Sequence, residues 1–88
     1  MEIEWTDEDP ATGAKRSVRA ARFARKWTFK VRARRYENWQ AVPEPSRDMW
    51  ETLLDALERR LPRREGVMDE DVKDVRAAIA RLPADEEN

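Results

Sequence analysis

The sequence of 88 residues contains no cysteine and no histidine, and it contains only two glycines. Without cysteine the chain forms no disulfide and has no thiolate nucleophile. Without histidine it lacks the side chain that most often exchanges protons near neutral pH, and a zinc site would lack both of its usual nitrogen and sulfur ligands. The glycines, Gly13 and Gly66, are too few for a glycine-rich loop that cradles phosphate.

Long apolar runs are also absent. No stretch approaches the roughly 20 apolar residues that are needed to span a bilayer. The first ten residues, MEIEWTDEDP, are acidic, whereas a signal peptide begins with a basic region and continues with an apolar one. We therefore expect a cytoplasmic protein with no membrane partner.

Motifs that carry catalysis or bind metals are missing as well. The serines are Ser17 and Ser46, and neither lies in the sequence of a nucleophile elbow. The acidic runs at residues 7–10 and 69–74 lack the ligand spacing of a calcium-binding EF-hand loop. We expect no enzyme activity, no cofactor and no metal site.

The net charge of -1 conceals an uneven distribution of charge along the chain. Residues 1–13 contain five acidic and no basic residues, and residues 14–36 contain ten basic and no acidic residues. The remaining residues, 37–88, contain fourteen acidic and eight basic residues. A basic block between two acidic blocks indicates either a polyanionic partner or neutralisation within the fold.

The basic block contains a regular alternation. In residues 26–36, KWTFKVRARRY, apolar side chains alternate with basic ones, which predicts a strand. Trp27, Phe29 and Val31 are expected to face the core, and the lysines and arginines are expected to lie on the opposite face.

The residues before this ribbon give weaker signals. Residues 2–5, EIEW, alternate in the same way and predict a short strand, and the polar stretch at residues 6–15 predicts a loop. Residues 17–25 fit both a helical spacing and a strand pattern. The aromatic and β-branched content from Trp27 onward favours an extended ribbon over one long basic helix.

Two amphipathic helices are predicted in the second half of the chain. The first spans residues 47–61, with Ser46 as its N-cap and Pro62 at its end. The second spans residues 70–82, with Asp69 as its N-cap. Their apolar stripes comprise Met49, Trp50, Leu53, Leu54, Leu57 and Leu61 in the first helix and Val72, Val75, Ile79 and Leu82 in the second. The outward side chains of the second helix are expected to be Asp71, Lys73 and Asp74.

Together these patterns predict an α+β fold. A small N-terminal antiparallel β-ribbon or sheet would pack on a C-terminal antiparallel two-helix hairpin. We expect one small α+β domain over residues 1–83, followed by an acidic disordered tail at residues 84–88.

The basic segment at residues 15–35 raises the hypothesis of nucleic-acid binding, because arginine makes strong contacts to phosphate. The candidate phosphate contacts are Arg22, Arg25, Lys30, Arg32, Arg34 and Arg35. Proteins that bind single strands need aromatic side chains on the same face as the cations, and here the two kinds are expected on opposite faces. Pairing of the first strand beside the ribbon would also place Glu2 and Glu4 across from Lys30, Arg32 or Arg34 and neutralise the ribbon.

The favoured interpretation is a non-enzymatic small protein-interaction or assembly module, with nucleic-acid binding as the alternative. Tryptophan, tyrosine and arginine are the residues that most often anchor interfaces. The candidate interface residues are Trp5, Tyr36 and Trp39. Because a small sheet leaves unpaired edges, the partner is expected to be another protein or a second copy, in a homodimer that uses the first strand or the ribbon.

Overall fold

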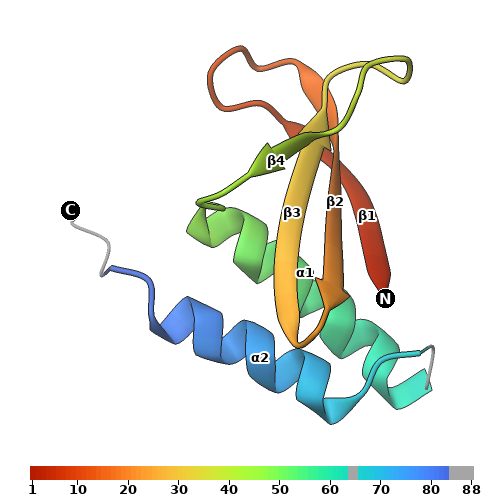
Figure 1. The fold of residues 1–88 in the computed structure, drawn as a ribbon, viewed down its shortest axis with the longest axis vertical. Coiled ribbons are helices and arrows are strands. Elements are labelled where there is room, and N and C mark those ends of the chain that lie inside the picture. Colours follow the sequence, from red (N-terminus) through yellow and green to blue (C-terminus); the bar gives the residue numbers. More distant parts are fainter. Residues whose placement is uncertain (64–65, 84–88) are drawn as a thin grey trace. The chain divides into compact units, whose positions relative to one another are not determined.

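The structure is a computed structural model that describes residues 1–63 and 66–83. The chain divides into two compact units, residues 1–45 and the residues from Ser46 onward. The first unit contains a four-stranded sheet and the second contains two α-helices, so the predicted α+β class is confirmed (Figure 1). The packing of the sheet on the helices and the single domain over residues 1–83 stay predictions. The predicted tail at residues 84–88 lies outside the described residues.

The sheet is antiparallel throughout, and its strands follow one another in chain order. They are β1 (Glu2–Glu8), β2 (Lys15–Phe23), β3 (Lys26–Arg32) and β4 (Gln40–Val42). The order β1-β2-β3-β4 places β1 and β4 at the two margins (Figure 1).

β1 is longer than the strand predicted at residues 2–5, and the predicted loop at residues 6–15 was wrong for residues 6–8 and for Lys15, which begins β2. Pairing with β2 extends this strand, because its register runs without interruption to the pair of Glu8 and Lys15. The turn that follows is short. The Asp9 carboxylate accepts a hydrogen bond from the backbone N–H of Ala11 at 2.8 Å, and Gly13 adopts a φ of 76°. The extension of β1 depends on its pairing with β2. The alternation of residues within β1 does not reveal this pairing.

The ambiguous segment 17–25 is extended, and it ends in a tight hairpin turn. β2 and β3 are joined by Ala24 and Arg25, and the flanking residues Phe23 and Lys26 are paired. Ala24 has a φ of 53° and Arg25 a φ of 65°. Two-residue hairpin turns of this kind favour asparagine and glycine, because residues with a Cβ are strained at positive φ.

We expect the double substitution Ala24→Asn with Arg25→Gly to stabilise the chain by about 1 kcal/mol, because it relieves strain at two positions. Thermal unfolding followed by circular dichroism measures this effect. The matched control is Arg35→Gly, which lies in an exposed loop outside the positive-φ pair and is expected to give no stabilisation. A lower melting temperature in the double variant would show that the turn is not strained.

The predicted faces of β3 are confirmed, but the strand ends at Arg32, so the prediction of a strand was wrong for residues 33–36. Trp27 and Phe29 are buried, whereas Lys26 and Lys30 are exposed. Phe29 is opposite Ala20 of β2, which is also buried. The remaining buried residues of the sheet unit are Ile3 and Val18.

β4 was not predicted from the sequence. Its three residues lie in the stretch that the prolines marked as irregular. They pair with β3 from Phe29 to Val31. A strand this short has no periodicity of its own, so only its partner identifies it.

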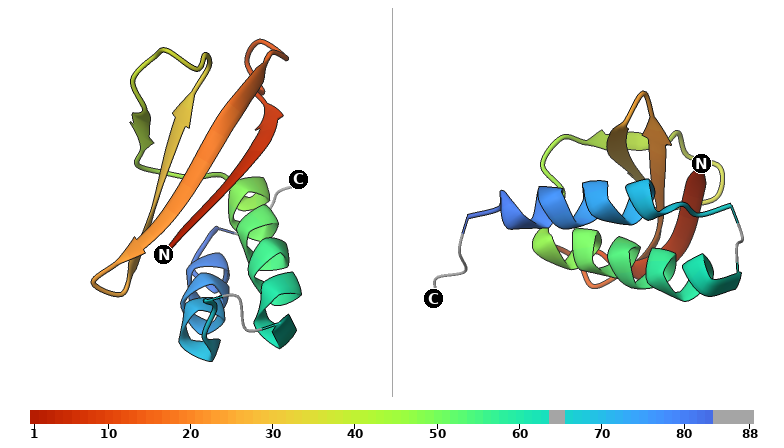
Figure 2. Two further views of the ribbon diagram at one scale, coloured as in Figure 1. Left: turned by 90° about the vertical axis from the view of Figure 1, so that its right-hand side faces the viewer. Right: turned by 90° about the horizontal axis from the view of Figure 1, so that it is seen from below.

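The second unit contains the two predicted helices, α1 (Arg47–Arg60) and α2 (Asp69–Ala80), with a short 3₁₀ helix at Leu61–Arg63. The Ser46 hydroxyl accepts a hydrogen bond from the backbone N–H of Met49 at 3.3 Å, so the predicted N-cap of α1 is confirmed. The helices lie side by side and antiparallel (Figure 2). Among the described residues, neither helix has the length and apolar character required to cross a bilayer.

Both ends of α2 differ from the predicted range of residues 70–82, and the helix ends at Ala80. Asp69 is the first residue of the helix, and Met68 occupies the N-cap position. The Asp71 carboxylate accepts a hydrogen bond from the backbone N–H of Met68 at 2.9 Å, and Asp71 is buried instead of outward. The helix therefore begins with a side chain that reaches back from its third residue, as in a capping box.

Candidate functional site

One face of the sheet, here called the charged face, carries most of the charged side chains of the strands. Residues directly opposite one another in an antiparallel pair project to the same face. Glu4 is opposite Arg19, and Arg19 is opposite Lys30, so these three residues form one row across β1, β2 and β3. The charged face comprises Glu2, Glu4, Thr6, Glu8, Lys15, Ser17, Arg19, Ala21, Phe23, Lys26, Thr28, Lys30 and Arg32.

The charge on this face differs between the strands, because β1 carries acidic residues whereas both β2 and β3 carry basic residues. The guanidinium of Arg19 lies 2.8 Å from the Glu4 carboxylate and 3.9 Å from that of Glu2. The predicted pairing of Glu2 and Glu4 with the ribbon was wrong, because β2 lies between β1 and β3. The acidic residues are instead paired with Arg19 of β2.

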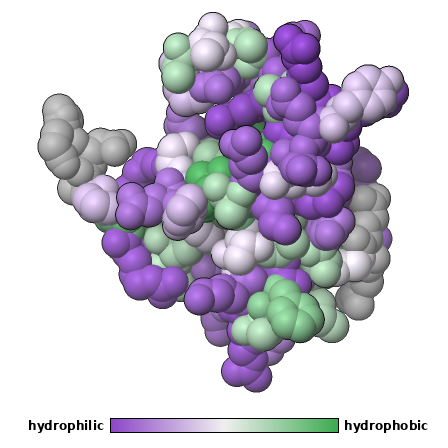
Figure 3. Space-filling view, turned by 45° about the horizontal axis from the view of Figure 1, so that its top comes forward, coloured by the Kyte–Doolittle hydropathy of each residue, from purple (hydrophilic) through white to green (hydrophobic). Residues whose placement is uncertain are grey.

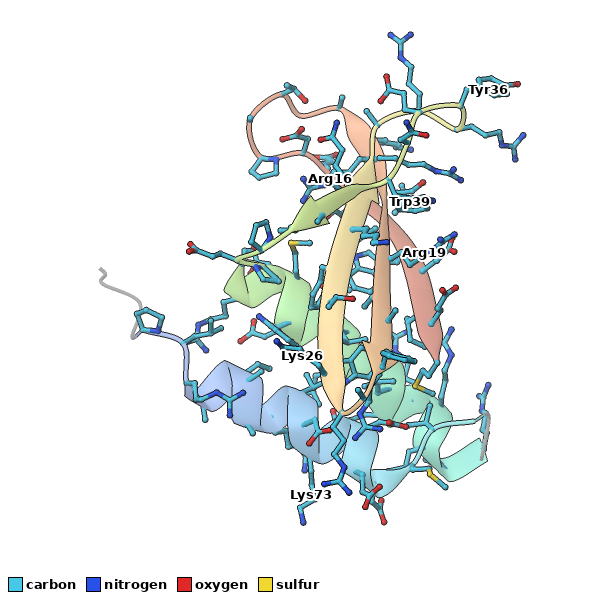
Figure 4. The ribbon with its side chains drawn as sticks, viewed as in Figure 1. Arg16, Arg19, Lys26, Tyr36, Trp39 and Lys73 are labelled. Carbon is cyan, nitrogen blue, oxygen red and sulfur yellow. The ribbon has the colours of Figure 1, made fainter. Side chains whose placement is uncertain are left out.

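Trp39, one of the candidate interface residues, lies on the charged face. The guanidinium carbon of Arg19 is 4.3 Å from the centre of the Trp39 ring, and that of Arg32 is 4.4 Å from it (Figure 4). Both distances are typical of cation–π contacts. The loop between β3 and β4 thus brings an aromatic ring to the cations, although the aromatic residues of β3 itself lie on the opposite face.

The structure does not bring the candidate phosphate contacts together. Lys30 and Arg32 lie on the charged face, but Arg22 is opposite Trp27 and projects to the other face. Arg25 lies at the tip of the hairpin between β2 and β3. The other two candidates, Arg34 and Arg35, lie in the exposed loop that follows β3. The six residues are distributed over four places of the sheet unit.

The candidate interface residues are also separated. Trp5 is half-buried on the face opposite the charged face, where its ring contacts Phe29 edge to face at 6.3 Å. Tyr36 is 94% exposed and projects from the loop between β3 and β4 (Figure 4). Hydrophilic residues cover most of the surface in Figure 3, and apolar residues form only small, separate patches on that face.

The backbone of β1 has a free side that the hydrogen bonds of the hairpin define. The N–H of Arg22 donates to the C=O of Met1 at 3.0 Å, and the N–H of Asp9 donates to the C=O of Ala14 at 2.8 Å. Met1 and Asp9 flank β1, and both have odd numbers, so in the register that pairs β1 with β2 the odd-numbered residues make the hydrogen bonds to β2. Because alternate residues of an edge strand direct their backbone groups to opposite sides, the even-numbered residues direct theirs away from β2. These residues are Glu2, Glu4, Thr6 and Glu8.

The two margins of the sheet are protected to different degrees. β4 has only three residues, and Pro43 and Pro45 follow it closely, which limits pairing with another chain. β1 has seven residues, contains no proline or lysine, and pairs with β2 without a bulge. Among the described residues, β1 pairs with β2 alone. Only residues 2–5 of this strand were predicted, because Asp7 interrupts the apolar alternation of Ile3 and Trp5.

A separate ion pair lies on the face of the sheet opposite the charged face. Arg16 lies 2.7 Å from Asp7, and both side chains are partly buried. The hydrogen bond that Arg16 donates to Asp7 raises the pKa of Arg16 above its ordinary value. Within residues 1–63 and 66–83, no cluster of acidic side chains has the arrangement needed to hold a metal ion.

Comparison of the chain with models of protein families, with curated proteins and with solved structures found no match.

Proposed function

We propose that the chain is a non-enzymatic protein-interaction module that binds an extended segment of a partner at the edge of β1. The observation that supports this proposal is the free side of β1, where four residues direct backbone N–H and C=O groups away from the sheet. An extended segment that adds a strand to a sheet gains main-chain hydrogen bonds along its whole length. The side chains of Glu2 and Glu4, two of these four residues, are 59% and 48% exposed.

Nucleic-acid binding stays the second candidate, and the position of Trp39 favours it. A ring beside Arg19 and Arg32 resembles the combination of stacking and charge that single-strand binding uses. Two features oppose it. Arg19 is already paired with Glu4, and the acidic residues of β1 share the face with the cations.

The proposed function is tested by selection from a library of random peptides at physiological salt, in parallel with titration of mixed duplex and single-stranded nucleic acid. We expect selected peptides to bind and to shift the NMR resonances of β1. Nucleic acid should bind no more tightly than the micromolar range that is typical of nonspecific contacts. Tight binding of nucleic acid that weakens steeply with salt, together with a failure to select any peptide, would contradict the proposal.

A further inference from the structure

We infer that the partner segment at the β1 edge carries lysine or arginine at alternate positions, an inference that rests on the proposed function. The residues that direct their backbone groups outward are Glu2, Glu4, Thr6 and Glu8, and their side chains all lie on the charged face. Three of these four residues are acidic. An incoming strand therefore meets a row of carboxylates with a spacing of two residues.

The spacing determines which residues of the partner meet the carboxylates. Residues two apart in a strand are separated by about 6.6 Å and project to the same face. Side chains directly opposite one another in adjacent strands have Cβ atoms about 5 Å apart, within reach of ion pairing. A partner with basic residues at every second position would place one cation opposite each glutamate. The intervening residues would lie beside Ile3 and Trp5 on the other face, where apolar side chains fit.

The inner side of β1 already shows this complementarity. β2 places Arg19 opposite Glu4, Ser17 opposite Thr6 and Lys15 opposite Glu8. The Arg19 guanidinium reaches the Glu4 carboxylate at 2.8 Å. A carboxylate has two oxygens with capacity for several donors, so Glu4 can accept further hydrogen bonds from a strand on its outer side.

The same charges disfavour a second copy of this chain at the β1 edge. In an antiparallel pair of two β1 strands, outward-directed residues lie opposite outward-directed residues. The outward-directed residues of each copy are three glutamates and Thr6. In every register, at least one glutamate of one copy therefore lies opposite a glutamate or Thr6 of the other copy. Like charges directly opposite one another are destabilising. A basic partner is therefore favoured over the homodimer that the sequence suggested.

The charge requirement is tested with three labelled peptides, each about nine residues long so that it can pair along the whole of β1. The first alternates lysine and valine, the second alternates glutamate and valine, and the third contains the lysines and valines in two blocks. Fluorescence anisotropy at low and physiological salt measures binding. We expect the alternating lysine peptide to bind at least about tenfold more tightly than either control.

Charge substitutions in the protein locate the site. The double variant Glu2→Lys with Glu4→Lys should weaken binding of the alternating lysine peptide by about tenfold, because it replaces attraction by repulsion at two positions. The matched control is Glu37→Lys with Glu44→Lys, which changes the net charge equally at exposed positions outside β1. The control should bind the peptide with an affinity within about twofold of the wild type.

Proline at position 6 tests the backbone contribution. The N–H of Thr6 is directed away from β2, so Thr6→Pro removes an outward donor without removing a bond between β1 and β2. We expect Thr6→Pro to abolish peptide binding and to retain the folded circular dichroism spectrum. Thr6→Val keeps the N–H and should bind like the wild type.

The outcomes separate the inference from the proposed function. The inference of a basic partner is contradicted if the lysine and glutamate peptides bind equally, or if Glu2→Lys with Glu4→Lys does not weaken binding. Either result is still compatible with a module that binds an extended segment at the edge of β1. Failure of every peptide, including those selected from the random library, overturns both. A wild-type dimer that light scattering detects and that Thr6→Pro dissociates would make a second copy the occupant of the edge and overturn the choice of a basic partner.

Discussion

Replacement of Leu53 or Leu57 by alanine is expected to lower the free energy of unfolding by about 2–5 kcal/mol. Both leucines lie on α1 and are 0% exposed. Each substitution removes buried methyl groups and leaves a cavity that the surrounding side chains fill only in part. The loss would be a large fraction of the 5–15 kcal/mol or so that is typical of the total stability of a domain.

Urea denaturation followed by circular dichroism at the helical minimum measures this loss. Leu54→Ala is the matched control, because Leu54 lies on the same helix but is only half-buried. The apolar stripe of α1 did not distinguish Leu54 from its neighbours, whereas the structure predicts a smaller effect for Leu54→Ala than for Leu53→Ala. Equal midpoints for all three variants and the wild type would show that this face of α1 is not a core.

Replacement of Phe29 by alanine is expected to cost about 3–5 kcal/mol. Phe29 is 1% exposed, and it lies in β3 between Ala20 of β2 and Val42 of β4. The substitution also removes the edge-to-face contact with Trp5, a type of contact that contributes roughly 0.5–1.5 kcal/mol beyond the buried area.

The second phenylalanine of the chain provides the control for this experiment. Phe23 lies in the same sheet but is 85% exposed. Phe23→Ala should change the stability by less than about 0.5 kcal/mol, as is usual for exposed positions. Chemical denaturation with tryptophan fluorescence as the readout compares the two variants. A loss of stability in Phe23→Ala as large as that in Phe29→Ala would contradict the assignment of the two faces.

The two helices were predictable from the sequence because their signals are local. Ser46 caps α1 from the adjacent position, and apolar residues recur at the helical period along both helices. The wrong prediction of Asp69 as the N-cap of α2 also has a local cause. Several acidic residues begin α2 together, and sequence alone does not show that Asp71 is the one that reaches back to the backbone.

The details of the sheet were less predictable because they depend on pairing between distant residues. The turn at Ala24 and Arg25 lacks the asparagine and glycine that usually indicate a two-residue hairpin. β4 is defined by its pairing with β3 and has no pattern of its own. The position of Trp39 beside Arg19 follows from the loop between β3 and β4, which brings together residues 20 positions apart in the chain.

The candidate site could be predicted only in part for the same reason. The glutamates of residues 2–5 were recognisable as one face of a strand. Their partner was not, because the order of strands places β2 and not the basic ribbon beside β1. The direction of each backbone group depends on the register of the hairpin, which the sequence does not determine.

Amide hydrogen exchange along β1, measured by NMR with and without the alternating lysine peptide, tests the central claim most directly. Without peptide, the outward amides of Glu4, Thr6 and Glu8 should exchange faster than the inward amides of Ile3 and Trp5, which are bonded to β2. Saturating peptide should slow the outward amides by about tenfold or more and change the inward ones little. Outward amides that exchange at the same rate with bound peptide as without it would contradict the assignment of β1 as the binding edge.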